Sequence, residues 1–270
     1  MFEKLVIFDY SGTLSTDAVR FGEDDSLMET LKRSGLTELG IADTKVFWEE
    51  IVNPSWEEGS TTSIGYVEVI ARQVKNKFSP AVQNGRIRQS AERFVDSYLT
   101  FSRINGLWRT TLEDLDKNTS VITVIATDHY AEATGYIIGF LEEMGAAATS
   151  LTGPPGATSS RKFIVANSAD MGFHKADPGF WEKIKSVLNL NAIDSVLIID
   201  DFGANEKAED TYADQHKVDK RKHATVDLLK SVFTVPVYVI PFVLSGKDNT
   251  SCRDLIDRVS GQIKEYLSEG

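Results

Sequence analysis

Three short apolar runs stand out along the chain, at residues 5–8, 121–126 and 196–199. Each is rich in β-branched residues and does not alternate with polar positions, which is typical of strands covered by helices on both faces. Two further strands are expected at residues 147–151 and 235–240. The pattern therefore predicts a parallel sheet in an α/β protein.

Helical periodicity fills the segments between these runs. Residues 107–115 and 131–144 precede and follow the second run, and residues 178–188 open with a proline suited to a first helical turn. The long stretch between the first two runs has few strand-like segments, so we expect a helical insert there, with helices at residues 26–32, 45–52, 64–75 and 87–101. A polar, charge-rich insert at residues 211–230 is expected to be helical in its second half.

The three runs all end in polar residues. Asp9 follows the first run, Thr127 and Asp128 follow the second, and Asp200 and Asp201 follow the third. In open α/β sheets, ligands bind at the carboxyl ends of the strands. Three polar strand ends therefore indicate one shared site.

The first motif is the sequence Phe-Asp-Tyr-Ser-Gly-Thr-Leu at residues 8–14. A carboxylate at a strand end can attack phosphorus or carbon and form a covalent intermediate, which makes Asp9 a candidate nucleophile. Gly12 lets the backbone turn tightly beside it. Since the motif is short, an ordinary strand-to-loop turn capped by the aspartate is the alternative.

Two more motifs carry a hydroxyl and a lysine. Thr127 can form a hydrogen bond with a phosphoryl oxygen, or it can simply cap a helix. Lys175 lies shortly before the helix that starts at Pro178, from where it can reach back to the strand ends. Its ammonium could then neutralise a phosphoryl group and hold a carboxylate, the alternative being a solvated lysine.

The last motif is a cluster of acids after the third run, at Asp200, Asp201 and Glu206. Carboxylates gathered at a strand end repel one another unless a cation lies among them. Hard oxygen ligands favour Mg2+. A pair of solvent-exposed aspartates is the alternative, although it fits poorly after so apolar a run.

Composition narrows the class of protein. The 270 residues include 41% hydrophobic and 26% charged residues, which is ordinary for a globular protein with a buried core. The formal net charge of -11 argues against binding to nucleic acid. The single cysteine excludes an intrachain disulfide and fits a cytoplasmic setting. No apolar run approaches the roughly 20 residues that span a membrane, so no membrane association is expected.

Taken together, the four motifs resemble those of the haloacid dehalogenase (HAD) superfamily of hydrolases in their order, strand context and separation. The resemblance implies a Rossmann-like core formed by residues 1–15 and 105–270. It also implies a helical cap of the C1 type at residues 16–104, inserted after the first motif. Phosphatases of this superfamily bind Mg2+ and act on small phosphorylated metabolites.

The resemblance also assigns roles to individual residues. It implies that Asp9 is the nucleophile, that Thr127 contacts the transferred group and that Lys175 supports it electrostatically. The implied Mg2+ ligands are Asp9, the carbonyl of Ser11, Asp201 or Asp200, and Glu206. We expect Gly12, Thr13, Asp128 and His129 to line the substrate-binding site. For His129, a capping role is the alternative.

Ser11 departs from the superfamily's phosphatase pattern, in which a second aspartate at this position protonates the leaving group. General acid–base help is typically worth about 10²–10⁴-fold in rate. With Ser11 at this position, the protein could hydrolyse activated phosphates, whose leaving groups need little protonation, or turn over slowly. It could also have lost catalysis and still bind phosphate esters. It also resembles the branch that hydrolyses carbon–phosphorus bonds, which needs a cap lysine such as Lys32 or Lys45. The carbon–halogen branch does not fit, because its tyrosine and its Ser-Ser-Asn run are missing.

Overall fold

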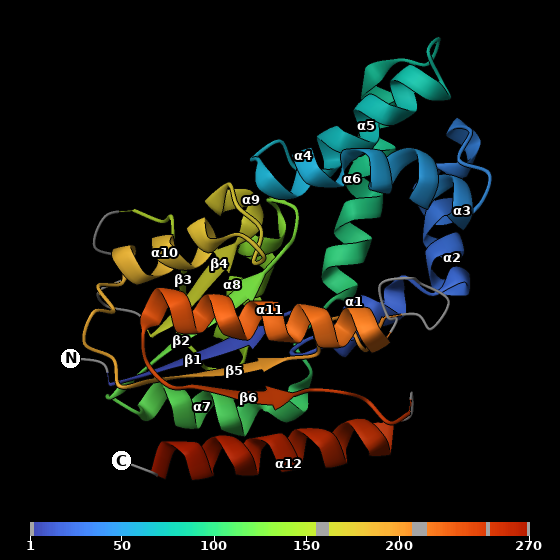
Figure 1. Cartoon of the computed structure of the whole chain (residues 1–270). Coiled ribbons are helices and arrows are strands. Elements are labelled where there is room, and N and C mark those ends of the chain that lie inside the picture. Colours follow the sequence, from blue (N-terminus) through green and yellow to red (C-terminus); the bar gives the residue numbers. More distant parts are fainter. Residues whose placement is uncertain (1–2, 155–161, 207–214, 247–248, 269–270) are drawn as a thin grey trace.

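The fold is a single six-stranded parallel sheet covered by helices, as a computed structural model describes it for residues 3–154, 162–206, 215–246 and 249–268 (Figure 1). The strand order is β3-β4-β2-β1-β5-β6, and every adjacent pair is parallel. The strands are β1 (Lys4–Asp9), β2 (Val121–Thr127), β3 (Ala148–Ser150), β4 (Phe163–Asn167), β5 (Ser195–Asp200) and β6 (Val237–Pro241). The predicted α/β class is confirmed.

Side chains of the central strands alternate between two apolar layers. In β1, Val6 and Phe8 belong to one buried cluster, and Leu5 and Ile7 belong to the other. Because both faces are buried, the strand is apolar at each of residues 5–8, as the sequence pattern indicated. The charged residues of β1 stand at its two ends, Lys4 at the start and Asp9 at the carboxyl end.

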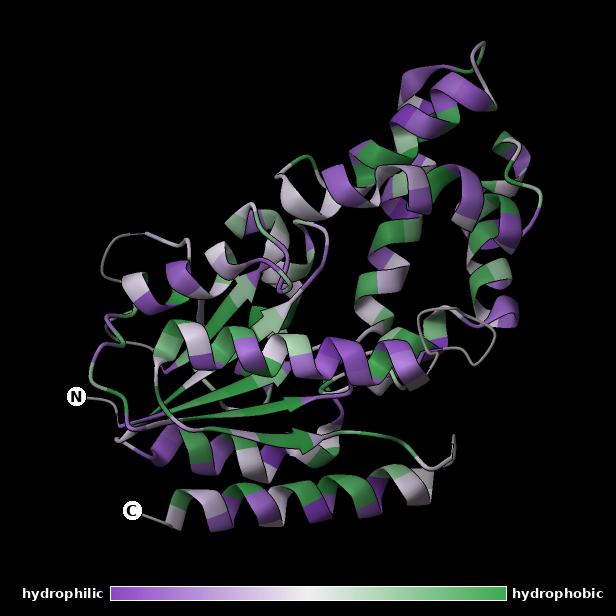
Figure 2. Cartoon of the chain, in the orientation of Figure 1, coloured by the Kyte–Doolittle hydropathy of each residue, from purple (hydrophilic) through white to green (hydrophobic). Residues whose placement is uncertain are grey.

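Helices cover both faces of the sheet. On one face lie α7 (Arg109–Lys117), α8 (Ala133–Glu143) and α12 (Asn249–Ser268), whose apolar residues join the cluster that contains Phe8. On the other lie α9 (Ser168–Met171), α10 (Pro178–Val187) and α11 (Gln215–Phe233). Figure 2 shows α12 and α11 with green apolar and purple polar positions interleaved along their length. Each helix thus turns an apolar stripe to the sheet.

The elements between β1 and β2 are all helices, joined by turns and loops, and most of them extend beyond the carboxyl edge of the sheet (Figure 1). We call residues 16–101 the insert. Its core is apolar, centred on Phe47 and Phe94, whose ring centroids lie 4.9 Å apart. The insert comprises α1 (Thr16–Phe21), α2 (Asp24–Ser34), η1 (Thr37–Leu39), α3 (Thr44–Val46), η2 (Phe47–Val52), η3 (Asn53–Ser55), α4 (Trp56–Thr61), α5 (Tyr66–Lys77) and α6 (Asn84–Phe101). A helical insert is confirmed, whereas its status as a separate domain stays a prediction.

Some elements differ from the sequence expectation. Strand β4 and helix α12 were not expected, and β4 places a sixth strand between β2 and β3. Of the charge-rich segment at residues 211–230, the first four residues lie outside the described part of the chain, and the rest belongs to α11. Within the described ranges, no helix has the length and apolar character needed to cross a membrane.

Candidate active site at the carboxyl edge of the sheet

Three neighbouring strands end at the same point of the sheet edge. β1 lies between β2 and β5. Asp9 is level with Ala126, the penultimate residue of β2. On the other side Phe8 is level with Ile199, so Asp9 and Asp200 end their strands together. The parallel register therefore converts three distant sequence positions into one cluster.

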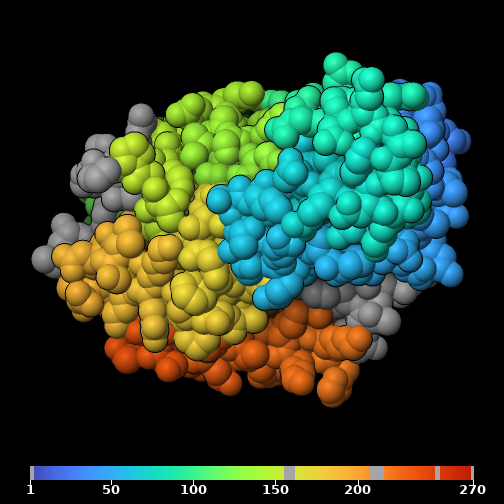
Figure 3. Space-filling model, turned by 90° about the horizontal axis from the view of Figure 1, so that it is seen from above, coloured from blue at the N-terminus to red at the C-terminus, as the bar shows by residue number. Residues whose placement is uncertain are grey.

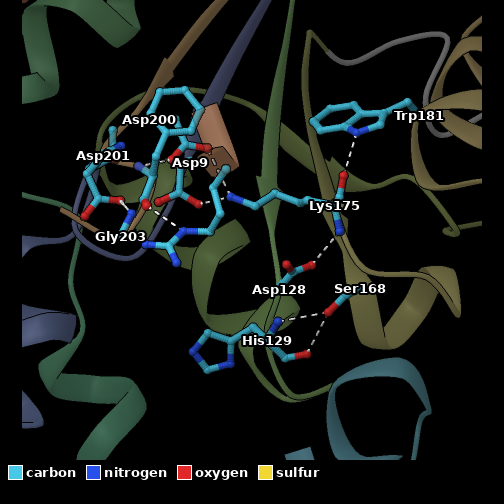
Figure 4. Close-up of polar contacts among 12 residues, drawn as sticks. Asp9, Asp128, His129, Ser168, Lys175, Trp181, Asp200, Asp201 and Gly203 are labelled. Atoms are coloured by element: carbon cyan, nitrogen blue, oxygen red, sulfur yellow. Dashed lines mark hydrogen bonds and ion pairs between the residues drawn. The ribbon is translucent and has the colours of Figure 1, made fainter. Parts of the chain in front are cut away.

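Three carboxylates and one ammonium meet at this point. Asp9, Asp200 and Asp201 are buried, and each offers an oxygen to a group whose members lie within 4.8 Å of one another. Lys175 donates from Nζ to Oδ1 of Asp9 at 2.5 Å and to Oδ2 of Asp200 at 3.2 Å. Its side chain extends from the loop between α9 and α10 across the strand ends (Figure 4). Four of the expected site residues are thus brought together.

Burial dominates the electrostatics of the cluster. It raises the pKa of Asp9 to about 7, with the ammonium of Lys175 opposing this change and the charge of Asp200 adding to it. Burial also raises the pKa of Asp201 well above its usual range, and the charges of Asp9 and Asp200 add to the effect. For Lys175, burial disfavours the charge, but the surrounding carboxylates outweigh burial and raise its pKa. The carboxyl groups of Asp9 and Asp201 therefore resist ionisation.

The donor set fits a divalent cation. When all three carboxylates are ionised, the one ammonium leaves two uncompensated negative charges, three minus one, in a buried place. Carboxylate oxygens are the ligands that Mg2+ prefers, and a cation among them reverses their tendency to hold protons. The residues that could hold Mg2+ are Asp9, Asp200 and Asp201.

A tight turn brings the first motif against Asp201. Gly12 has a φ of +81°, and a Cβ there would lie 2.5 Å from Oδ2 of Asp201. The hydroxyl of Thr13 accepts a hydrogen bond from the backbone N–H of Asp201 at 3.2 Å. Gly12 and Thr13, expected to contact substrate, therefore contact the carboxylate loop. Ser11 is partly buried in the same turn.

Asn205 was missed by the sequence analysis. Its Nδ2 donates to the carbonyls of Gly12 and Phe242, both at 2.8 Å, and its backbone N–H donates to Oδ2 of Asp201 at 3.0 Å. It thus joins the first motif, the loop after β5 and the segment after β6. Its position four residues after Asp201, inside the acidic motif, was the available signal.

The loop that carries Lys175 is fixed on both sides. The backbone N–H of Lys175 donates to Oδ1 of Asp128 at 2.9 Å, and its carbonyl accepts from Nε1 of the buried Trp181 at 2.7 Å (Figure 4). Burial raises the pKa of Asp128, against the opposing charge of Lys175. Asp128 therefore holds the lysine backbone. Thr127, beside it, is buried at the end of β2.

His129 contacts the insert. Its Nδ1 accepts a hydrogen bond from the backbone N–H of Tyr130 at 2.9 Å, so the proton of the neutral ring lies on Nε2, which is 3.0 Å from the hydroxyl of Tyr98 in α6. The two rings are stacked with centroids 5.6 Å apart. Burial lowers the pKa of His129 to about 4, which keeps the ring neutral. The structure thus places His129 against a helix of the insert.

Three other expected residues lie apart from the cluster. Among the described residues, Glu206 is not part of the carboxylate group, and its charge instead adds to the raised pKa that burial gives Tyr98. Lys32 is exposed. The side chain of Lys45 is 77% exposed and lies 3.9 Å from Glu49 on the same stretch of helix. Neither lysine is buried in the way that Schiff-base lysines in hydrophobic pockets are.

Comparisons with known proteins add three structural likenesses. No protein-family model and no curated protein matches the sequence. A 2-haloacid dehalogenase from Pseudomonas syringae pv. Tomato DC3000 is 18% identical over 74% of this chain and 78% of its own, with a TM-score of 0.48. A predicted HAD-like family hydrolase from Porphyromonas gingivalis is 12% identical over 100% of both chains, with a TM-score of 0.47.

The third likeness is to the HAD-hydrolase YfnB from Bacillus subtilis, whose structure is described as bound to magnesium and as revealing interdomain movement. It is 15% identical over 74% of this chain and 79% of its own, with a TM-score of 0.41. At these identities and TM-scores, the likenesses carry no argument about activity or ligands. The chain resembles the haloacid dehalogenase superfamily through its own motifs, its α/β fold and its helical insert.

Proposed function

We propose that the protein is a Mg2+-dependent hydrolase of the HAD superfamily, of the phosphatase type, acting on a small phosphorylated metabolite. The observation that carries this proposal is the buried group formed by Asp9, Asp200 and Asp201, with Lys175 hydrogen-bonded to two of the three. The group lies at the carboxyl edge of a parallel sheet, where ligands of α/β proteins bind. Buried charges of this kind cluster at functional sites.

Each residue of the group has a chemical task in this proposal. Asp9 attacks phosphorus through the carboxylate oxygen that Lys175 does not hold, the bond to the leaving oxygen breaks, and an aspartyl phosphate forms. Lys175 fixes the orientation of Asp9 and neutralises charge on the phosphoryl group. The hydroxyl of Thr127 binds a phosphoryl oxygen. Water then attacks phosphorus and releases phosphate and free Asp9.

Mg2+, when bound, supplies positive charge that stabilises the phosphoryl oxygens and keeps the carboxylates ionised. We assign it to Asp9, Asp200 and Asp201, with the carbonyl of Ser11 as a further ligand. The pKa of about 7 for Asp9 applies to a site without this charge. Metal binding therefore releases protons and strengthens as the pH rises.

Ser11 sets the expected substrate range. A serine hydroxyl does not act as an acid at neutral pH, so a substrate with a good leaving group gains most from this site. We expect acyl phosphates to react faster than simple phosphate monoesters. Hydrolysis of the aspartyl phosphate also lacks the usual base, so the phosphorylated enzyme should accumulate.

The direct test is a substrate panel of acyl phosphates, phosphate monoesters and phosphonates with Mg2+. Turnover on an acyl phosphate that disappears in Asp9→Asn and on addition of EDTA supports the proposal. Mass spectrometry after a rapid acid quench should find one phosphoryl group on Asp9. Absence of turnover on every compound, with ligand binding unaltered in Asp9→Asn, would identify a binding protein instead.

A second test restores the missing acid. Ser11→Asp should raise phosphate monoester hydrolysis by about 10-fold or more, because general acid–base catalysis is worth about 10²–10⁴-fold. Ser11→Asn is the matched control, since it has the same size and cannot donate a proton as an acid. Equal activity of the two variants would show that the leaving-group proton does not limit the rate.

A further inference from the structure

Helix α11 reaches the loop that carries the catalytic carboxylates. Arg221, in the polar half of this helix, is partly buried and donates from Nε to the carbonyl of Phe202 at 2.9 Å. Phe202 follows Asp201 directly. The helix is held on the sheet by the buried side chains of Val218 and Leu229, which flank Arg221 along the chain. The charge-rich segment of the sequence therefore touches the candidate site at one defined point.

Phe202 has an unusual backbone conformation. Its φ is +52°, a left-handed value that bulky residues rarely adopt and that costs free energy unless the surroundings impose it. The phenylalanine ring is buried in the apolar layer beneath α11. Its carbonyl accepts from Arg221, and its N–H donates to Oδ1 of Asp200 at 2.6 Å. The strained residue is thus held at its ring, its carbonyl and its amide.

This conformation fixes Asp200. One carboxylate oxygen accepts from Phe202 and the other from Lys175, so the carboxylate plane is set by two donors on opposite sides. If φ of Phe202 relaxed to a negative value, the chain before it, with Asp200 and Asp201, would rotate about the N–Cα bond relative to the buried ring and to the carbonyl that Arg221 holds. The loop would also shift at Gly203, whose N–H donates to Oδ1 of Asp201 at 3.1 Å.

We propose that Arg221 is a positioning residue, which holds Phe202 in its left-handed conformation and thereby sets Asp200 and Asp201 for Mg2+ binding. The proposal rests on the function proposed above and assigns a role to the charge-rich helix. Partners outside the ligand set commonly tune a metal site, and their loss typically weakens metal affinity by about 10- to 100-fold.

The test is the Mg2+ affinity of the full chain, measured by isothermal titration calorimetry without substrate. Arg221→Met keeps the aliphatic stem and removes every donor, and it should bind Mg2+ about 10- to 100-fold more weakly than the wild type. Arg221→Lys keeps a donor and should recover part of this loss. Lys220→Met removes an exposed charge from the same helix and should bind as the wild type does.

A double-mutant cycle with Phe202→Gly identifies the mechanism. Glycine adopts a positive φ without strain, so Arg221→Met should weaken Mg2+ binding less in the Phe202→Gly background than in the wild type. An equal loss in both backgrounds would overturn the role of Phe202. The cycle compares affinities within folded proteins, so the lost phenylalanine ring cancels.

Three results would overturn the inference about Arg221. They are Arg221→Met binding Mg2+ within twofold of the wild type, Arg221→Lys binding no better than Arg221→Met, and Lys220→Met losing as much affinity as Arg221→Met. A wild-type protein that binds no Mg2+ would overturn the proposed function as well. Failure of the inference alone leaves wild-type binding intact, so the two failures are distinguishable.

Discussion

The sheet edge and the insert use charged residues in opposite ways. At the sheet edge, Asp9, Asp200 and Lys175 are buried together and contact one another directly. In the insert, ion pairs such as Arg88 with Glu68 lie on the surface, where both side chains are about half exposed or more, at 58% and 49%. Buried charges must be paired or bind metal, whereas exposed pairs contribute little to stability.

The difference teaches which contacts serve function and which serve folding. The insert is held by apolar packing around Phe47 and Phe94, so its surface charges can vary at small cost. The sheet edge carries a charged cluster that lowers stability unless every partner is present. The two regions meet through residues that follow the strand ends, and Figure 3 shows α4 of the insert against the segment around α9.

This junction combines both kinds of contact. Glu132, at the start of α8, accepts hydrogen bonds from the N–H groups of Tyr66 and Val67 at the first turn of α5, at 2.8 and 3.1 Å. The ring of Tyr66 stacks on Tyr130 with centroids 3.8 Å apart. His174, the neighbour of Lys175, has its Nε2 2.7 Å from the hydroxyl of Ser60 in α4. Residues adjacent to the candidate catalytic groups therefore position the insert.

The strongest test of the comparison removes one cation from each region. Lys175→Met leaves Asp9 and Asp200 buried without their partner, and breaking a buried pair in this way costs about 3–5 kcal/mol of unfolding free energy. Arg88→Met breaks two exposed pairs, with Glu68 and Glu92, and should cost about 1 kcal/mol or less. Urea unfolding at pH 8 without metal measures both. Similar losses for the two variants would contradict the distinction.

The second test uses pH at the junction. Burial lowers the pKa of His129 to about 4, below its value of about 6.5 in the unfolded chain. As the pH falls, His129 is therefore protonated in the unfolded chain before it is protonated in the folded protein. The contribution of His129 to the unfolding free energy is fully present above pH 6.5 and is lost progressively as the pH falls from 6.5 to 4. The difference corresponds to about 3 kcal/mol.

Accordingly, His129→Gln should show a flatter loss of unfolding free energy between pH 6.5 and 4 than the wild type. His223→Gln is the control, because His223 is exposed on α11. Parallel stability curves for the wild type and His129→Gln over this range would count against a neutral, buried His129.

The third test adds one methyl group to each region. Gly12→Ala forces a Cβ to 2.5 Å from Oδ2 of Asp201 at a φ of +81°, so it should cost about 1–3 kcal/mol and weaken Mg2+ binding. Gly85→Ala, in the first turn of α6, meets no atom within 4 Å and should stabilise the protein by about 0.4–1 kcal/mol. Thermal unfolding and calorimetry measure the pair. The prediction fails if both substitutions change stability in the same direction.

The smallest expected effect concerns the contact between the two regions. Glu132→Gln removes a negative charge from the N-terminus of α5, where it interacts favourably with the helix dipole, and should cost about 1 kcal/mol. The amides of Tyr66 and Val67 should exchange faster with deuterium. Glu142→Gln is the control, because Glu142 is exposed near the end of α8, the helix that Glu132 precedes. Unchanged exchange at both amides would show that the apolar stacking alone fixes the insert.

Much of the fold could be read from local patterns, and the misses have a physical cause. The strand ending at Asp9 was recognisable because the four residues before it, residues 5–8, are all apolar, as double burial requires. β4 was missed although its apolar run, residues 163–166, is as long as the run at residues 5–8, and its place between β2 and β3 depends on the ladder rather than on its own residues. Asn205 and Arg221 were missed for a similar reason, because polar side chains in a loop or helix show no preferred partner in the sequence.

The sequence by itself determined which chemical groups stand at the strand ends, since strand ends and turns are local features. It also determined that a serine, Ser11, stands two residues after Asp9. Only the tertiary structure decided that Lys175 contacts both Asp9 and Asp200, that His129 contacts the insert, and that Gly12 lies against Asp201. These contacts join segments far apart in the chain, so they depend on sheet register and helix packing, which no single segment encodes.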